Sequence, residues 1–255
     1  MVHARVMRSV LGGLDVVTEQ ARPEGPCEGV VVLCHGFGAP GSDLVGLGRA
    51  LSSLEPALAR VRFHFPAAPL SLGGLGYGDA RAWWMIDFEA LEALKAQHPD
   101  ALREFRKLEP EGMGAARKAL NAMVHAAMNA SGLPFSKLVL GGFSQGAMAT
   151  TDLALRLEEA PAGLVALSGT LLLEDVWRQK AKARAGLTVF QSHGRFDPIL
   201  PFTAARALEA LLTEQGLAVD FHAFDGGHEI PQPVLVALAR FLVARLGGPT
   251  PGAPG

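Results

Sequence analysis

The chain has 255 residues, of which 49% are hydrophobic and 19% charged, and its formal net charge is −2. This size and composition allow one large domain or two small ones with a sizeable core, and they exclude a wholly disordered chain. The nearly balanced charge gives no general attraction to nucleic acid or to an anionic membrane. The two cysteines exclude a disulfide framework, and no Cys/His cluster has zinc-binding spacing. We expect neither a metal site nor a nucleic-acid partner.

The first twenty residues lack the apolar run and the cleavage site of a signal peptide. No stretch of about 18 apolar residues follows, so we predict no membrane span and a cytoplasmic protein. No linker composition interrupts residues 1–246, which we predict to form one domain. Residues 247–255 (GGPTPGAPG) are predicted to be a flexible tail.

Short apolar runs rich in β-branched and aromatic residues predict the strands. A hairpin comes first, with Arg5–Leu11 and Leu14–Thr18 joined by two glycines. The further predicted strands are Val30–Cys34, Val61–Phe65, Lys137–Gly142, Gly163–Leu167, Leu187–Ser192 and Val219–Phe224.

Apolar residues spaced three and four apart predict helices between these strands. The predicted helices are one capped by Ser42 or Asp43, then Met113–Ala130, Gln145–Leu157, Ala204–Gln215 capped by Thr203, and Val234–Leu246 after Pro231 and Pro233. This alternation predicts an α/β fold, a mostly parallel central sheet flanked by helices on both faces. Residues 87–112 are unusually rich in charge and predict amphipathic helices, which are either a solvated excursion or a cap over a binding site.

The motif Gly142-Phe143-Ser144-Gln145-Gly146 stands where a strand pattern passes into a helix pattern. A serine nucleophile projects from such a tight turn in strained backbone geometry, and residues two before and two after it must be small. The start of the helix also directs backbone N–H groups toward a developing negative charge. We predict that Ser144 is the nucleophile.

A serine nucleophile needs a base. Where the serine stands in such a turn between strand and helix, the base follows it later in the chain. The histidines after Ser144 are His193, His222 and His228. His222 alternates within a strand pattern and His193 ends a strand, whereas His228 lies in a glycine-rich loop after the last strand. Because catalytic side chains gather in loops at the carboxyl ends of parallel strands, we favour His228.

The acid that orients this base is expected in the loop after Leu187–Ser192, the predicted strand that comes before the last one. Asp197 stands there, in the segment HGRFDP. The competing acids are Asp220, within a strand, and Asp225 and Glu229, both beside His228. We favour Asp197.

Two N–H donors are needed to stabilise a tetrahedral oxyanion. One is expected at Gln145, directly after the nucleophile. The other is expected in the loop after Val30–Cys34, where the amide of Phe37 is the best candidate. We expect His35 to pack beneath this loop and to transfer no proton.

These segments resemble, in order, the motifs of the phospholipase/carboxylesterase family of α/β hydrolases, which includes acyl-protein thioesterases and small carboxylesterases. They are HGFG, FPAAP, AWWMID, GGFSQGA, HGRFDPILP and GGHEIP, and they span roughly residues 30–246. The resemblance implies an α/β-hydrolase fold, a triad of Ser144, Asp197 and His228, and donors at Phe37 and Gln145. It agrees with the assignment from spacing.

Two departures from the family pattern concern the acyl pocket. The tryptophan loop is stretched to WWMID, and residues 87–112 are longer than in compact members. Apolar residues near the motifs predict pocket positions at Trp83, Trp84, Leu75 and Ile199. Substrate preference is therefore not transferred from the family.

We predict a serine carboxylesterase that hydrolyses short- to medium-chain carboxylic esters through an acyl-enzyme. The chemistry needs no cofactor, and we expect a small-molecule ester substrate and a monomer or homodimer. The alternatives are an acyl-protein thioesterase or a lysophospholipase. A peptidase and a non-catalytic binding module on the same fold are more remote alternatives.

Overall fold

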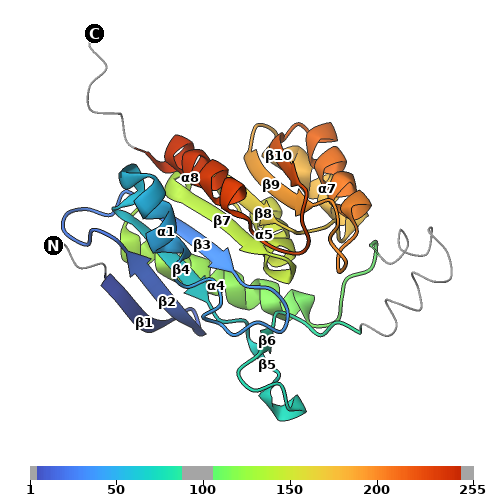
Figure 1. The fold of residues 1–255 in the computed structure, drawn as a ribbon, viewed down its shortest axis with the longest axis horizontal. Helices are drawn as coiled ribbons and strands as arrows, with labels where there is room; N and C mark the ends of the chain where they lie inside the picture. Colours follow the sequence, from blue (N-terminus) through green and yellow to red (C-terminus); the bar gives the residue numbers. More distant parts are fainter. Residues whose placement is uncertain (1–4, 88–105, 248–255) are drawn as a thin grey trace, which may run out of the picture.

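The computed structural model describes residues 5–87 and 106–247. Its centre is an eight-stranded sheet of order β1-β2-β4-β3-β7-β8-β9-β10 (Figure 1). The strands are β1 (Arg5–Leu11), β2 (Leu14–Gln20), β3 (Gly29–Cys34), β4 (Val61–Pro66), β7 (Leu138–Phe143), β8 (Gly163–Leu167), β9 (Thr188–Gly194) and β10 (Ala218–Phe224). β1 pairs with β2, and β2 with β4, in antiparallel fashion, and the neighbours from β4 to β10 are parallel.

Helices cover both faces of this sheet. They are α1 (Leu47–Leu54), α4 (Met113–Ser131), α5 (Gln145–Arg156), α6 (Glu174–Ala181), α7 (Phe202–Glu214) and α8 (Gln232–Leu246). Short 3-10 helices lie at Pro56–Leu58, Gly73–Leu75, Phe135–Lys137 and Lys182–Arg184. A separate small hairpin pairs β5 (Leu70–Ser71) with β6 (Arg81–Ala82).

Alternating side chains of the buried strands divide the core into two layers. Val31 and Leu33 of β3 pack in the layer that contains α1 and α8. Val30 and Val32 pack on the opposite side, with α4, α5, α6 and α7. Figure 1 shows α1 and α8 together over one face of the sheet. The architecture predicted from the alternation, one domain with a mostly parallel central sheet flanked by helices on both faces, is thus present.

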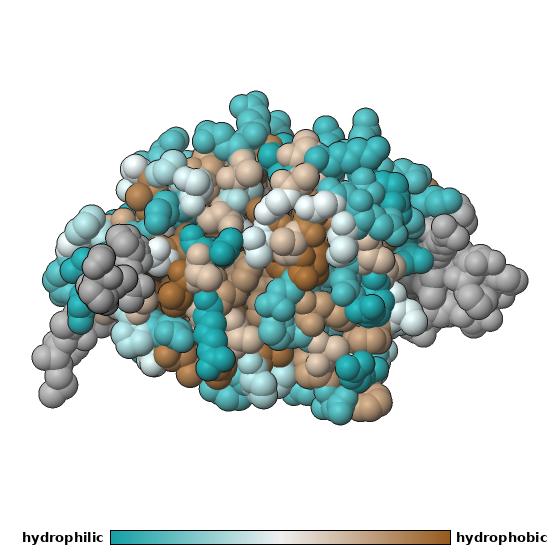
Figure 2. All heavy atoms as spheres, turned by 90° about the horizontal axis from the view of Figure 1, so that it is seen from above, coloured by the Kyte–Doolittle hydropathy of each residue, from teal (hydrophilic) through white to brown (hydrophobic). Residues whose placement is uncertain are grey.

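The outer surface seen from above combines polar residues at its periphery with apolar residues exposed nearer its middle (Figure 2). Scattered apolar exposure is normal for a folded protein, because polar surface is insufficient to cover it. In the described part of the chain, no helix has both the length and the apolar character that crossing a membrane requires.

Two predicted helix starts are wrong. The helix expected after Ser42 or Asp43 begins only at Leu47, because a series of turns precedes it and Gly46 adopts a left-handed φ of 105°. Thr203 does not cap α7, which begins at Phe202 after Pro201. Neither helix has a side-chain cap, so the sequence signal for a capping residue was misleading here.

Three further segments differ from the sequence interpretation or lie beyond it. The sequence pattern did not predict α6. The glycine-rich run at residues 70–78, to which the sequence pattern assigned neither strand nor helix, contains β5 and a 3-10 turn. Of residues 87–112, interpreted as either a solvated excursion or a cap, residues 88–105 lie outside the described residues, as do residues 248–255 of the predicted tail.

Candidate active site

Ser144 occupies a strained turn between β7 and α5. Its φ of 55° and ψ of −122° fall in a region that residues with side chains rarely adopt. The turn is held because the Ser144 N–H donates to the carbonyl of Leu167, at 2.8 Å, and the first turn of α5 bonds back to the Ser144 carbonyl. The side chain is thereby presented at the carboxyl end of the sheet.

The glycines on either side of Ser144 are required by crowding. A Cβ added to Gly146 would lie 2.1 Å from the carbonyl oxygen of Cys34, and one added to Gly142 would lie 2.6 Å from the same oxygen. Both distances are far below any allowed contact, so no side chain fits at either position. The prediction that both glycines are set by the tight turn is confirmed.

His228 and Asp197 meet at this edge from the two loops that follow β10 and β9. The Nδ1 of His228 donates to Oδ2 of Asp197 at 2.6 Å. The imidazole packs against the ring of Phe143, with centroids 4.7 Å apart, and its side chain is 12% exposed. The hydrogen bond from Nδ1 to Asp197 fixes the tautomer that leaves Nε2 as a proton acceptor.

The carboxylate of Asp197 is fully hydrogen-bonded. Its Oδ1 accepts the backbone N–H groups of Ile199 and Leu200 at 2.8 and 2.9 Å, while Oδ2 accepts from His228. Burial opposes its charge, but the hydrogen bonds from His228, Leu200 and Ile199 outweigh burial and lower the pKa of Asp197. Asp197 is therefore ionised wherever the protein is folded near neutral pH.

The competing histidines have other partners. His193 is buried in β9, where its Nε2 lies 2.9 Å from the Leu200 carbonyl and 3.3 Å from Asp197. Burial lowers the pKa of His193, so it is neutral and supports the Asp197 loop. His222 stacks on Phe190 of the sheet, with centroids 4.6 Å apart.

The competing acids also have other partners. A carboxylate oxygen of Asp220 lies 3.0 Å from Nε2 of His222, and Asp225 pairs with Arg195 at 3.2 Å. Glu229 accepts the N–H of Gly227. Among the predicted candidates, Asp197 is the acid hydrogen-bonded to His228.

The loop after β3 carries Phe37 toward Ser144. A Cβ on Gly36 would lie 3.3 Å from the Cβ of Ser144, so the loop backbone passes close to the nucleophile. His35 is buried beneath the loop, where its Nε2 accepts the N–H of Ala68 at 3.0 Å and its Nδ1 donates to the Gly36 carbonyl. Burial lowers the pKa of His35, so the ring is a neutral structural bridge.

A cavity of about 350 Å³ opens beside these groups. Ser144, Gln145, His228 and Phe37 line it, together with apolar side chains. The apolar lining residues are Ala39, Ile86, Phe143, Met148, Pro198, Ile199 and Leu200, and Asp43 adds one carboxylate. Among these apolar residues, only Ile199 is one of the pocket positions predicted from the sequence. Met148 stands four residues after Ser144 on α5, and this helical spacing is a signal that could have identified it.

Three predicted pocket residues are not on this wall. Trp83 and Trp84 are only 1% and 2% exposed and belong to the core, because their large rings bury most favourably beneath the loop. Leu75 is 63% exposed, on the 3-10 turn between β5 and β6. Ile86, two residues beyond Trp84, takes the place expected of the tryptophans.

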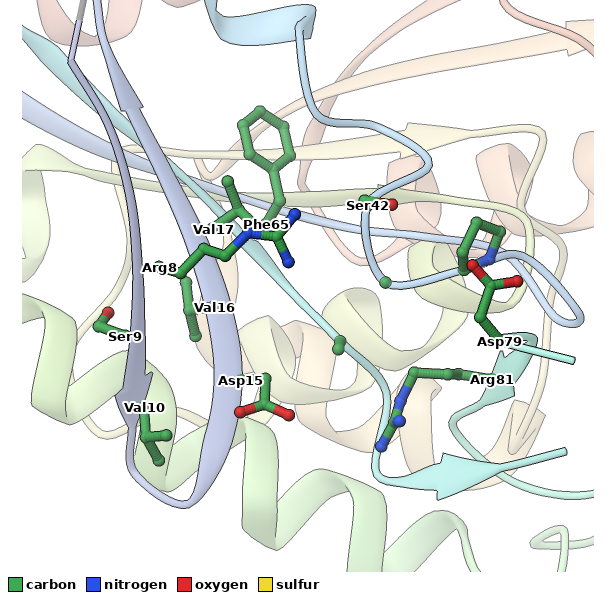
Figure 3. A pocket seen from close by; sticks show the side chains of 13 residues that line it. Arg8, Ser9, Val10, Asp15, Val16, Val17, Ser42, Phe65, Asp79 and Arg81 are labelled. Carbon is green, nitrogen blue, oxygen red and sulfur yellow. The ribbon is translucent and has the colours of Figure 1, made fainter. Parts of the chain in front are cut away.

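A larger cavity of about 590 Å³ lies elsewhere, between the β1–β2 hairpin and the loop at residues 40–42. Figure 3 shows Asp79 and Arg81 on one side of it and Arg8 and Asp15 on the other. None of the predicted catalytic residues lines it. Volume alone therefore does not identify the active site. Ser144 and His228 line the smaller cavity.

Comparisons with known proteins agree with this arrangement. The family model described as Phospholipase/Carboxylesterase matches residues 16–246. Acyl-protein thioesterase 1 of Eremothecium gossypii is 29% identical over 230 residues, which cover 89% of this chain and 92% of that relative. Acyl-protein thioesterase 1 of Kluyveromyces lactis is 31% identical over 179 residues, which cover 69% and 72%.

Solved structures share the fold over nearly the whole chain. Esterase PE8 superposes with a TM-score of 0.73 at 25% identity, covering 96% of this chain and all of the other. A carboxylesterase from Mesorhizobium loti superposes with a TM-score of 0.70 at 19% identity, covering 94% and 98%. With the family model matched from residue 16 to residue 246, the chain belongs to the phospholipase/carboxylesterase family of α/β hydrolases, and it is a serine hydrolase.

Proposed function

We propose that this protein is a carboxylesterase in which Ser144 is the nucleophile, His228 the general base and Asp197 the orienting acid. The observation that carries the proposal is the 2.6 Å bond from His228 Nδ1 to Asp197, with His228 and Ser144 lining the same apolar cavity. The N–H groups of Phe37 and Gln145 are the proposed oxyanion donors.

In the acylation step, the Ser144 hydroxyl oxygen attacks the ester carbonyl carbon while His228 Nε2 takes its proton. The carbonyl π electrons move onto oxygen, and the two N–H donors stabilise that oxyanion. Collapse of the tetrahedral intermediate breaks the bond to the leaving alcohol, which receives the proton from His228. Asp197 stabilises the imidazolium without accepting its proton.

In the deacylation step, water replaces the alcohol. His228 takes a proton from water, and the resulting oxygen attacks the acyl-Ser144 carbonyl. A second oxyanion forms in the same place, and its collapse releases the carboxylic acid. The proton on His228 returns to the Ser144 oxygen, which restores the resting enzyme.

The volume and the apolar lining of the cavity favour short- to medium-chain acyl groups. Its volume of about 350 Å³ is at the small end of the range for ligand sites, and its wall is mainly apolar. Met148 on α5 and Ile199 on the loop after β9 contribute to that wall. An acyl chain of moderate length removes its apolar surface from water there.

A thioesterase or lysophospholipase is the second candidate. It is favoured by the printed names of the relatives, since several are acyl-protein thioesterase 1. The same triad cleaves oxoesters and thioesters, because the acyl-enzyme is identical and only the leaving atom differs. Substrate length and leaving group therefore distinguish the candidates better than the catalytic residues do.

The test measures kcat/KM on p-nitrophenyl esters from acetate to dodecanoate, with Ser144→Ala as the blank. Acyl thioesters of matched length and a lysophospholipid are assayed beside them. A maximum at short or medium oxoesters supports the carboxylesterase. A maximum at long chains with equal or faster thioester cleavage supports the second candidate and refutes the first.

A cavity-wall variant connects this preference to the structure. Met148→Ala enlarges the cavity and is expected to shift the maximum toward longer acyl chains. The matched control is Met128→Ala, because Met128 is 2% exposed on α4 and does not line the cavity. An identical shift in both variants would show that loosening of the core, and not the cavity wall, sets the preference.

A further inference from the structure

The side chain of Gln145 makes two hydrogen bonds to a distant loop. Its Oε1 accepts the backbone N–H of Trp83 at 3.0 Å, and its Nε2 donates to the backbone carbonyl of Trp84 at 2.8 Å. Gln145 is 1% exposed, so water does not compete for these bonds. The residue directly after the nucleophile thus holds the loop that continues to Ile86 on the cavity wall.

The indole of Trp83 extends this connection to the loop after β3. Its Nε1 donates to the backbone carbonyl of His35 at 2.9 Å. The same loop is held from its other side by the His35 ring, which accepts the N–H of Ala68. Trp83 is 1% exposed and its ring lies 5.9 Å from that of His35, so the contact is shielded from water.

These bonds form a continuous path between the two segments that carry the proposed oxyanion donors. Gln145 carries one donor on its own backbone, and Phe37, two residues after His35, carries the other. The path begins at the side-chain amide of Gln145, which is hydrogen-bonded to the Trp83 backbone, and continues from the Trp83 indole to the His35 carbonyl. Both hydrogen bonds are direct and join buried groups.

We propose that the Gln145 side chain and the Trp83 indole are positioning groups that hold the two oxyanion donors at their working separation. This inference rests on the proposed function, because it concerns the same reaction. Both act through the backbone N–H groups of Phe37 and Gln145, which are the proposed oxyanion donors.

The kinetic consequence follows from the geometry that an oxyanion requires. Donors act at about 2.7–3.1 Å from the developing oxyanion, a site occupied in the transition state and not by the ground-state carbonyl. A displacement of about 1 Å costs up to about 100-fold in rate. Substrate affinity depends on the whole apolar wall, to which the loop at Trp83 and Trp84 adds Ile86, so loss of a positioning group lowers kcat much more than it raises KM.

The variants are Gln145→Met and Trp83→Phe. The first retains length and both proposed N–H donors but removes the side-chain bonds, and the second retains an aromatic ring without the indole N–H. Matched controls replace the same residue types elsewhere. Gln191→Met removes a buried amide that donates to Ala205, at 2.8 Å, and Trp177→Phe removes an indole N–H that donates to Asp152, at 2.9 Å.

The assays are kcat and KM on p-nitrophenyl butyrate and the inhibition constant of an alkyl trifluoromethyl ketone. The Ser144 oxygen adds to the ketone carbon, its proton passes to His228, and the carbonyl oxygen becomes a stable oxyanion. We expect kcat to fall about 10- to 100-fold in both variants. The inhibition constant is expected to rise by a similar factor, while KM changes less than threefold. The two controls retain wild-type kcat.

Two results overturn the inference. One is a wild-type kcat in Trp83→Phe, which decides the matter if Gln145→Met does not fold. The other is an equal loss of kcat in the controls, which would show general loosening of the structure. Failure of the proposed function itself is distinguishable, because Ser144→Ala would then retain turnover.

Discussion

His64 offers a quantitative prediction about stability and pH. It lies on β4 at 5% exposure, where its Nδ1 is 2.9 Å from the hydroxyl of Thr18 on β2. Its Nε2 is buried and has no hydrogen-bond partner among the described residues. Burial, with a smaller contribution from the charge of Arg62, lowers the pKa of His64 from 6.5 to about 4.

The direction in which pH changes the free energy of unfolding follows from proton linkage. The unfolded chain binds a proton at His64 below pH 6.5, whereas the folded protein does so only near pH 4, so acid favours unfolding between these values. The stability that neutral His64 contributes is complete above pH 6.5 and is lost as pH falls toward 4. At about 1.36 kcal/mol per pKa unit, the loss is about 3 kcal/mol.

The assay is urea unfolding of the wild type and of His64→Gln at several values between pH 7.5 and pH 4. The free energy of unfolding of the wild type, minus that of the variant, is expected to fall by about 3 kcal/mol over this range. Other groups titrate in both proteins and cancel in the difference. His125→Gln, at an exposed position, is the matched control for the change of residue type. A difference independent of pH would show that protonation of His64 is not coupled to unfolding.

Three further changes are expected to have separable effects. Asp197→Asn keeps the loop but loses the charge that orients His228, so kcat should fall about 10³- to 10⁴-fold in steady-state assays with the circular dichroism spectrum unchanged. Asp152→Ala removes a buried carboxylate that accepts from half-buried arginines on α4 and α5 and from the buried Trp177 indole on α6, so urea unfolding should show a loss of about 1–3 kcal/mol. Gly146→Ala forces a Cβ against Cys34, so soluble expression should fall sharply; a soluble, active variant would contradict the crowding.

The parts of the site that the sequence predicted depend on strand order and on short local motifs. The positions of Ser144, Asp197 and His228 depend on strand order and on loops at the carboxyl ends of parallel strands, and strand patterns of buried sheets are strong. The glycines around Ser144 follow from local backbone crowding, which is also visible in a short motif.

The parts that were missed depend on packing between distant segments. Trp83 and Trp84 lie near the motifs in sequence, yet their rings turn into the core and Ile86 faces the cavity instead. The side-chain bonds from Gln145 to the loop more than sixty residues earlier have no sequence periodicity. The start of α1 was misplaced because Ser42 and Asp43 occupy turns and not a cap.

The most direct test of the account locates the nucleophile. The protein is treated with an alkyl fluorophosphonate, in which the serine oxygen displaces fluoride from phosphorus, and the modified peptide is identified by mass spectrometry while turnover is followed. We expect one adduct per chain, on Ser144, formed in step with the loss of activity, and neither labelling nor turnover in Ser144→Ala. An adduct on another residue, or turnover retained by Ser144→Ala, would contradict it.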